Sequence, residues 1–292
     1  MGKQCKTNGC YISINCLEHM KLSIITINYN NKAGLQKTID SVICQTWKDY
    51  EWIIIDGGST DGSKELIEQY QQHFAYWCSE PDKGVYNAMN KGVEHAHGMY
   101  VSFMNSGDVF HDGDVLANVF SKALHGDILI GQVRCMGTGL VVNQFTMNTC
   151  DIGWQRINEG FCHQGTFSKL ALLKAYPFDE NLKIASDWKF WCQTIIFENK
   201  SIQNLGIIVA DYDMNGMSSD EENDELHRKE RELIIKSLFP PIILKELSDY
   251  ETLRNSSFVY DMRYLEKHSH CIYVILRKMI SFVYCILYKL LA

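Results

Sequence analysis

The stretch DYEWIIIDGGSTDGS, residues 49–63, contains the repeating unit on which the fold depends. Residues 52–55 are a short run of tryptophan and isoleucine, which is typical of a buried strand. A glycine-rich polar turn follows at 56–62, and residues 63–72 are interpreted as a helix. A strand, a polar turn and a helix in this order predict one unit of a parallel sheet covered by helices.

The same unit recurs on both sides of that stretch. The predicted elements are strands at 22–27, 74–78 and 99–104 and helices at 33–45 and around 86–96. Each strand ends in a polar cluster, and the four clusters occupy residues 28–30, 56–61, 80–84 and 105–108. Because ligands of such sheets bind outside the carboxyl ends of the strands, we expect the four clusters to line one crevice.

The pattern changes in the second half of the chain. The predicted elements there are strands at 127–134, 140–145 and 207–210, a turn at 137–139, and helices at 168–175 and 188–198. Residues 220–231 are rich in charge, and we interpret them as a helix with a solvent-exposed face.

Composition and motifs exclude several classes of protein. The formal charge of −7 over 292 residues provides no basic surface for nucleic acid. Eleven cysteines without a C-x-x-C pair argue against a zinc site or a disulfide framework, and indicate reduced thiols in a cytosolic chain. A Walker A lysine and a G-x-G-x-x-G motif are both absent, which disfavours P-loop and dinucleotide-binding proteins.

Two carboxylates at element ends have a structural and a chemical interpretation. Asp108 follows the buried strand of SFMNSGDVF, residues 102–110, either as a turn residue or as an oxygen ligand for Mg²⁺ or Mn²⁺. Asp187 stands at a helix start, either as a cap or as a general base for a sugar hydroxyl.

Two further acids, Asp56 and Asp61, flank the glycine-rich turn. This turn either approaches a ligand closely or is only a tight turn in which Asp61 caps the next helix.

Six ordered stretches together resemble the family 2 glycosyltransferases of the GT-A fold, the inverting bacterial type that builds surface polysaccharides. They are LSIITINYN (22–30), DYEWIIIDGGSTDGS (49–63), SEPDKGVYNAMNKG (79–92), SFMNSGD (102–108), HQGTF (163–167) and ASDWKFW (185–191). The resemblance runs over residues 22–219. It implies an α/β fold with a Rossmann-like, mostly parallel central sheet flanked by helices, followed here by a C-terminal helical extension.

The resemblance also implies roles for individual residues. Asp187 matches the general base, and Asp108 lies in the region of the family's D-x-D motif, where Asn105 and Gly107 replace acids. Asp108 is thereby left as the sole protein carboxylate on Mg²⁺ or Mn²⁺. His163 and Gln164 are placed on the acceptor side. The residues expected to contact the nucleotide sugar are Thr26, Asn28, Asn30, Asp56, Asp82, Asn90 and Asn105.

The implied reaction moves a hexosyl or N-acetylhexosaminyl group to an acceptor hydroxyl with inversion. We favour a UDP-sugar donor over a GDP-sugar, and a saccharide or lipid-linked saccharide as acceptor. The expected organisation is a poorly ordered extension at 1–20, a GT-A domain at 21–220 and a helical region at 221–292. Within the GT-A domain, residues 21–125 form the nucleotide-sugar half and residues 126–220 the acceptor half.

The tail CIYVILRKMISFVYCILYKLLA, residues 271–292, has the length of a membrane span, but Arg277 and Lys278 lie near its middle. On a helix these two cations share one side with Lys267 and Lys289, and the remainder is apolar. We interpret the tail as an amphipathic helix in the membrane interface, or alternatively as a core or dimer helix. The first interpretation places the protein in the cytoplasm, peripherally on the cytoplasmic face of the bacterial inner membrane.

Two alternatives to glycosyl transfer remain at this stage. The missing acids of the D-x-D region would suit a non-catalytic nucleotide-sugar-binding or regulatory protein of the same fold. A nucleotidyltransferase would need a basic, glycine-rich triphosphate loop, whereas the first strand ends in Asn28, Tyr29 and Asn30.

Overall fold

The computed structural model describes residues 22–143, 157, 160–214, 223–254 and 256–291. The chain divides into two compact units, Met1–Arg231 and Glu232–Ala292. The predicted extension at 1–20 lies outside the described residues, and so does the end of the strand predicted at 140–145.

The described residues of the first unit form one nine-stranded sheet in the order β3-β2-β1-β4-β8-β6-β9-β5, with β7 paired to β6. β1 pairs in parallel with both β2 and β4, and β2 pairs in parallel with β3, so these four strands form the parallel sheet that the sequence predicts. The strands are β1 (Leu22–Asn28), β2 (Tyr50–Asp56), β3 (Tyr76–Ser79), β4 (Tyr100–Phe103), β5 (Val109–Phe110), β6 (Ile128–Cys135), β7 (Val141–Val142), β8 (Thr166–Lys169) and β9 (Ile202–Tyr212).

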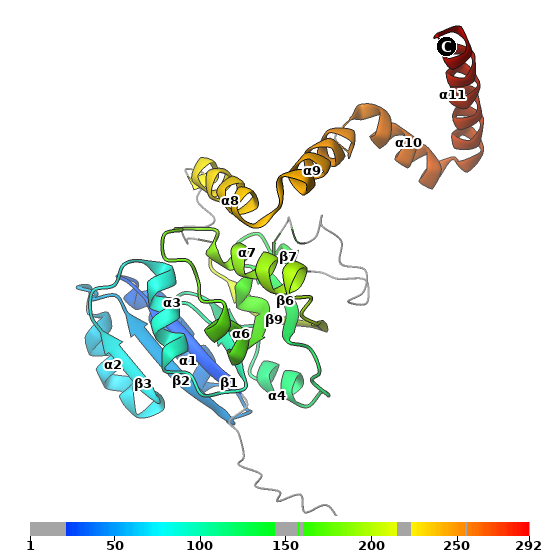
Figure 1. Cartoon of the computed structure of the whole chain (residues 1–292). Helices are drawn as coiled ribbons and strands as arrows, with labels where there is room; N and C mark the ends of the chain where they lie inside the picture. Colours follow the sequence, from blue (N-terminus) through cyan, green and yellow to red (C-terminus); the bar gives the residue numbers. More distant parts are fainter. Residues whose placement is uncertain (1–21, 144–156, 158–159, 215–222, 255, 292) are drawn as a thin grey trace, which may run out of the picture. The chain divides into compact units, whose positions relative to one another are not determined.

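Helices cover both faces of the sheet, and each face has its own hydrophobic core (Figure 1). Alternate residues of β1 serve the two cores: Ile24 faces α1, α2 and α4, whereas Ile25 faces α3, α6 and α7. A strand buried on both faces must be apolar throughout, which explains the unbroken isoleucine run in β2. These helices are α1 (Lys32–Ile43), α2 (Ser63–Tyr70), α3 (Val85–Glu94), α4 (Val115–Phe120), α6 (Leu170–Ala175) and α7 (Ser186–Trp191).

The second half of the sequence folds differently from its prediction in two places. Residues 168–175 were expected to be one helix, but Thr166–Lys169 is strand β8, which pairs antiparallel with β4 and β6, before α6 begins. The helix expected at 188–198 is α helical only to Trp191 and continues as a π-helix over Cys192–Phe197. The first difference comes from the pairing of β8 with β4 and β6, which local periodicity does not contain.

The C-terminal part of the chain is helical, as predicted. Its helices are α8 (Asp224–Leu238), α9 (Pro241–Arg254), α10 (Ser257–His268) and α11 (His270–Leu291). Among the described residues, none of the helices combines the length and apolarity needed to cross a bilayer. The six cysteines whose state the structure describes are free thiols: Cys44, Cys78, Cys135, Cys162, Cys192 and Cys271.

Glu51, near the start of β2, is hydrogen-bonded to β1 and to the segment before β4, at the end of the sheet opposite to the polar clusters. Its carboxylate is buried and accepts hydrogen bonds from Ser23 Oγ at 2.5 Å, His97 N at 2.5 Å and Gly98 N at 3.1 Å. Burial by itself would raise the pKa of Glu51, but the bonds from Ser23, His97 and Gly98 outweigh it and lower the pKa below its ordinary value.

We expect Glu51→Gln to lower the free energy of unfolding by about 1–3 kcal/mol at pH 7, since hydrogen bonds to a charged group are lost. A lowered pKa means that the ionised carboxylate stabilises the fold fully above its unfolded value, about 4.3, and progressively less as the pH falls through the folded value. The difference between wild type and variant should therefore shrink below about pH 4. Urea unfolding at several pH values measures it, and a constant difference down to pH 3 would contradict the assignment.

Candidate active site

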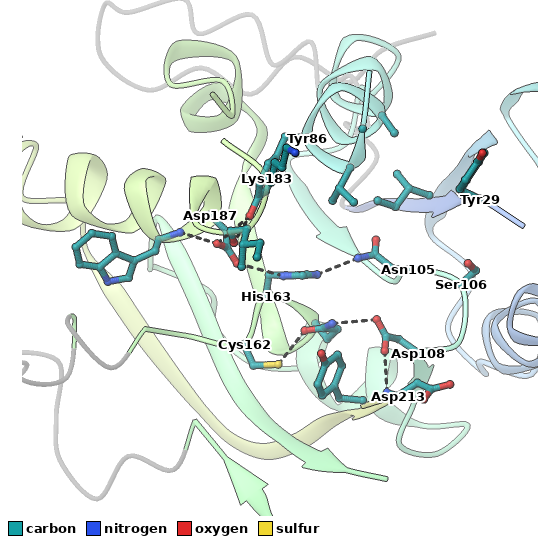
Figure 2. A pocket seen from close by; sticks show the side chains of 18 of the residues that line it. Tyr29, Tyr86, Asn105, Ser106, Asp108, Cys162, His163, Lys183, Asp187 and Asp213 are labelled. Carbon is teal, nitrogen blue, oxygen red and sulfur yellow. Dashed lines mark hydrogen bonds and ion pairs between the residues drawn. The ribbon is translucent and has the colours of Figure 1, made fainter. Parts of the chain in front are cut away.

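All four predicted polar clusters contribute to one cavity of about 1060 Å³, so the expected crevice is present. The lining contains at least one residue from each cluster, for example Asn28, Gly57, Asp82 and Asn105. Figure 2 shows the part of this cavity that contains the candidate catalytic side chains. The lining further includes Asp108, His163, Gln164 and Asp187, which the sequence singled out.

Asp108 is the carboxylate at the end of β4. Gly107, with φ of +109°, turns the chain in a conformation that favours glycine, and Asp108 is then only 4% exposed. Its Oδ1 accepts from Asp213 N at 3.0 Å and its Oδ2 from Gln164 Nε2 at 3.0 Å (Figure 2). Burial raises the pKa of Asp108 to about 6, although these two hydrogen bonds and His163 act in the opposite direction.

A second carboxylate lies beside Asp108. A Cβ atom added to Gly107 would come within 3.1 Å of Asp213 Oδ2, so the Asp213 side chain lies against the backbone of the Asp108 turn. Asp213 lines the cavity, and its charge contributes to the raised pKa of Asp108. The sequence analysis missed Asp213, although it too follows a strand, β9, and the signal that identified Asp108 applies to it equally.

These two acids fit a divalent cation that shares its coordination with a ligand. Among the described residues, no group of three or more histidine, cysteine or acidic side chains is arranged to hold a metal by itself. Mg²⁺ and Mn²⁺ accept as few as one or two carboxylates and complete their shell with phosphate oxygens and water. Two adjacent buried or half-buried carboxylates at a cavity wall are the oxygen donors that such an ion requires.

Asp187 is the second residue of α7 and faces the same cavity. Its Oδ1 accepts from Trp188 N at 2.7 Å and lies 3.3 Å from the Tyr86 hydroxyl, which donates at 2.5 Å to Ile184 O. Its Oδ2 lies 3.4 Å from His163 Nδ1 (Figure 2). Asp187 is therefore an acid of the first turn of α7, whose N-cap position is Ala185, and it also presents a carboxylate to the cavity.

Glu230 fixes the segment that precedes Asp187. It is 5% exposed, and its carboxylate accepts from the backbone N–H groups of Lys183, Ile184 and Ala185 at 2.7–3.0 Å. The interpretation of residues 220–231 as a solvent-exposed face is therefore wrong for this residue. The carboxylate of Glu230 can be buried because backbone N–H groups donate hydrogen bonds to it. These donors lie about 46 positions away in the chain, so the surrounding sequence does not indicate the burial.

Four of the predicted nucleotide-sugar residues are not part of the cavity lining: Thr26, Asn30, Asp56 and Asn90. Asp56 is fully buried, and its oxygens accept from Asn28, Ser59 and Ser79. It therefore orients Asn28, whose own Oδ1 is buried without a hydrogen-bond partner and which does line the cavity.

The other three have partners within the protein. Thr26 Oγ1 accepts from Trp52 Nε1 at 3.0 Å, and Asn30 Oδ1 accepts from Thr60 N at 2.9 Å. Asn90 exchanges two hydrogen bonds with the backbone of Phe178 and donates a third to Glu180. Their direct contact with a nucleotide sugar stays a prediction.

The comparisons with known proteins decide the family. The model of Glycosyl transferase family 2 matches residues 23–170, which is just over half of the chain. This chain belongs to glycosyltransferase family 2. An uncharacterized glycosyltransferase of Mycobacterium tuberculosis (strain H37Rv) is 32% identical over 212 residues, which cover 69% of this chain and 78% of the relative.

Two solved structures support the fold of this family 2 glycosyltransferase. TarS 1-349 from S. aureus, in complex with UDP-GlcNAc, aligns with a TM-score of 0.59 at 23% identity, over 72% of this chain and 65% of that one. Mannosyltransferase PcManGT from Pyrobaculum calidifontis, in complex with GDP-Man and Mn²⁺, aligns with a TM-score of 0.55 at 15% identity, over 90% and 80%. The predicted GT-A fold and the predicted glycosyltransferase function are confirmed.

Proposed function

We propose that this glycosyltransferase transfers a hexosyl or N-acetylhexosaminyl group from a UDP-sugar to an acceptor hydroxyl, with inversion at the anomeric carbon. The observation that carries the proposal is that one cavity is lined by both Asp108, a carboxylate suited to a metal ion, and Asp187, a carboxylate suited to a general base. Asn28 lines the same cavity at the end of β1.

Asp187 is proposed as the general base. An inverting displacement needs one carboxylate that accepts the proton of the attacking hydroxyl, and it needs no covalent intermediate. Asp187 is held at a helix start by its bond from Trp188 N and by the Glu230-bound segment before it. A fixed base of this kind spares the reaction the cost of orienting the proton acceptor.

Asp108, with Asp213 beside it, is proposed to hold Mg²⁺ or Mn²⁺. When bound, the ion neutralises negative charge on the departing nucleoside diphosphate. The structural similarity to a mannosyltransferase in complex with Mn²⁺ supports metal use, and the similarity to TarS in complex with UDP-GlcNAc supports a UDP-sugar as donor. The chain's own contribution is a buried acid, Asp108, beside a half-buried one, Asp213, whose like charges favour a cation between them and the donor.

A panel of nucleotide sugars tests the proposal. Purified protein is incubated with UDP- and GDP-sugars and Mn²⁺, and slow release of the free nucleotide is measured. Release from a UDP-sugar that stops when the metal is chelated supports the proposal. Binding without turnover, with any donor and with saccharide acceptors present, would favour the alternative of a non-catalytic nucleotide-sugar-binding protein.

We further propose that the acceptor is a lipid-linked or growing cell-surface saccharide, met on the cytoplasmic face of the bacterial inner membrane. The support is α11, which exposes apolar and cationic side chains together. Arg277, Lys278 and the preceding Lys267 are exposed. The exposed apolar residues of α11 are Ile272, Ile275, Met279, Ile280, Phe282 and Val283. An interfacial helix combines these two features, with its cations toward anionic headgroups.

We expect the full-length protein to sediment with liposomes that contain anionic lipid and to be partly released by high salt. The double variant Arg277→Glu, Lys278→Glu should lose most of this binding, because each cation near the surface contributes about 1 kcal/mol. The double variant Lys37→Glu, Lys64→Glu changes the net charge equally at two exposed positions of α1 and α2, and should bind like wild type. Wild-type protein that stays in the supernatant would show instead that α11 belongs to a protein interface.

A further inference from the structure

Two hydrogen-bond chains start from one short turn, the 3₁₀ helix His163–Gly165 (Figure 2). Gln164 Nε2 donates to Asp108 Oδ2 at 3.0 Å. The neighbouring His163 places Nδ1 at 3.4 Å from Asp187 Oδ2. Successive residues of the chain therefore contact the two carboxylates of the proposed reaction, both of which line the cavity.

The turn has little freedom to move. A Cβ atom on Gly165 would lie 2.6 Å from Gly131 O, so the turn packs directly on the backbone of β6. Asn143 is buried and exchanges two hydrogen bonds of 3.0 Å with the backbone of Cys162. On the other side, Thr166 Oγ1 donates to His163 O at 2.8 Å. The backbone that carries both side chains is thus held from both ends.

The amide of Gln164 is oriented by a thiol. Cys162 Sγ donates to Gln164 Oε1 at 2.8 Å, which leaves Nε2 directed at Asp108. Burial raises the pKa of the Cys162 thiol well above its usual range, so the sulfur keeps the proton that it donates. Gln164 itself is 3% exposed, and both ends of its amide have a partner.

The imidazole of His163 is oriented by Asn105. Asn105 Nδ2 lies 3.0 Å from His163 Nε2. An amide nitrogen can only donate, so this orientation of the Asn105 amide requires Nε2 to accept, which assigns the ring proton to Nδ1, the nitrogen that faces Asp187. The 3.4 Å separation is long for a hydrogen bond, as is common for catalytic contacts before substrate binds. Asn105 thereby acts from the D-x-D region on the base side of the cavity.

We propose that His163 and Gln164 are positioning residues, through which one rigid turn holds Asp187 and Asp108 in a fixed relation across the cavity. The proposal rests on the roles given above to these two carboxylates. It differs from the acceptor contact that the sequence resemblance implied for both residues. Its consequence is a separation of effects: a change at 164 alters metal-dependent donor binding, and a change at 163 alters turnover.

Gln164→Met tests the metal side, because methionine keeps the length of the side chain and removes the donor to Asp108. We expect the Mn²⁺ concentration for half-maximal UDP binding to rise about 10–100-fold, the usual effect of losing a group that orients a metal ligand. UDP affinity without metal should stay unchanged. The matched control is Gln203→Met, which removes hydrogen bonds to the 123–126 backbone outside the cavity. Calorimetry with UDP and Mn²⁺ gives both quantities.

His163→Phe tests the base side, because phenylalanine keeps a planar ring and removes both ring nitrogens. We expect kcat for hydrolysis of the best nucleotide sugar from the panel to fall about 10²-fold, as for a catalytic group displaced by about 1 Å, while UDP and Mn²⁺ affinities stay within about twofold. His95→Phe is the control, since His95 stacks on Tyr76 outside the cavity. In wild type, ¹⁵N NMR should find the His163 proton on Nδ1, and Asn105→Ala should redistribute it.

The outcomes separate this proposal from the proposed function. Wild-type protein that shows neither Mn²⁺-dependent UDP binding nor donor hydrolysis overturns the function and this proposal with it. If wild type shows both, but Gln164→Met and His163→Phe behave like their controls, the positioning role alone is overturned. A His163 proton found on Nε2 has the same meaning. Equal unfolding midpoints for each variant and its control show that the effects are local.

Discussion

Replacing Asp187 by asparagine is expected to lower glycosyl transfer by about 10²–10⁴-fold, the usual contribution of a general base. Asparagine preserves the shape of the side chain and an oxygen that can accept the bond that Trp188 N donates to Asp187 Oδ1 at 2.7 Å in the wild type, but it cannot take a proton. Donor affinity should change little, because the proposed role of Asp187, on α7, is toward the acceptor, whereas the proposed donor-side residues Asn28 and Asp108 lie at and after strands β1 and β4. Steady-state kinetics with the active donor separate kcat from KM.

The control for this variant is Asp40→Asn, which makes the same chemical change on the exposed side of α1. Normal turnover in Asp187→Asn would show that another group accepts the proton. A selective loss of UDP binding would instead move Asp187 from the acceptor side to the donor side of the cavity.

Asp108→Asn is expected to weaken metal-dependent donor binding by more than about 10²-fold. The loss of a group that only orients a metal ligand already lowers metal affinity by about 10–100-fold, and Asp108 is proposed as a ligand itself. The asparagine side chain retains an oxygen for the bond from Asp213 N and removes the negative charge that attracts the cation. Calorimetry of UDP binding with and without Mn²⁺ measures the effect. In a thermal scan, Mn²⁺ with UDP should raise the midpoint of wild type and leave that of the variant unchanged.

Asp112→Asn, at an exposed position of the next turn, is the matched control. An unchanged dependence on Mn²⁺ in Asp108→Asn would remove this residue from the metal site. Asp213, the other acid at this wall of the cavity, would then become the first candidate for the same experiment.

The first half of the fold could be predicted because its signals are local. An apolar strand, a polar turn and an amphipathic helix each lie within a dozen residues, and their repetition implies a parallel sheet. That topology alone brought the four strand-end clusters together and identified Asp108 as a residue of the crevice. Asp187 was found differently, through its position at a helix start and the resemblance of its motif to a family.

Strand β8 is an element that the local sequence pattern did not predict. Residues 166–169 precede a helix, and the sequence pattern joins them to it. In the fold they form β8, which lies between β4 and β6 and pairs antiparallel with both. The turn His163–Gly165 directly before β8 is positioned by this pairing, so its contacts with Asp108 and Asp187 could not be predicted from the residues around it.

The sequence by itself determined which residues are polar at the strand ends, and therefore which could reach a ligand. Only the tertiary structure decided which of them do. Asn28 and Asp56 occupy paired positions of β1 and β2, yet Asn28 lines the cavity while Asp56 is enclosed by three hydrogen-bonding neighbours. Asn90 donates to the backbone of Phe178, 88 positions away in the chain. Glu230 is buried because it accepts from backbone N–H groups about 46 positions away. The physical reason is that propensity depends on adjacent residues, whereas burial and hydrogen bonding depend on partners that meet only when the chain folds.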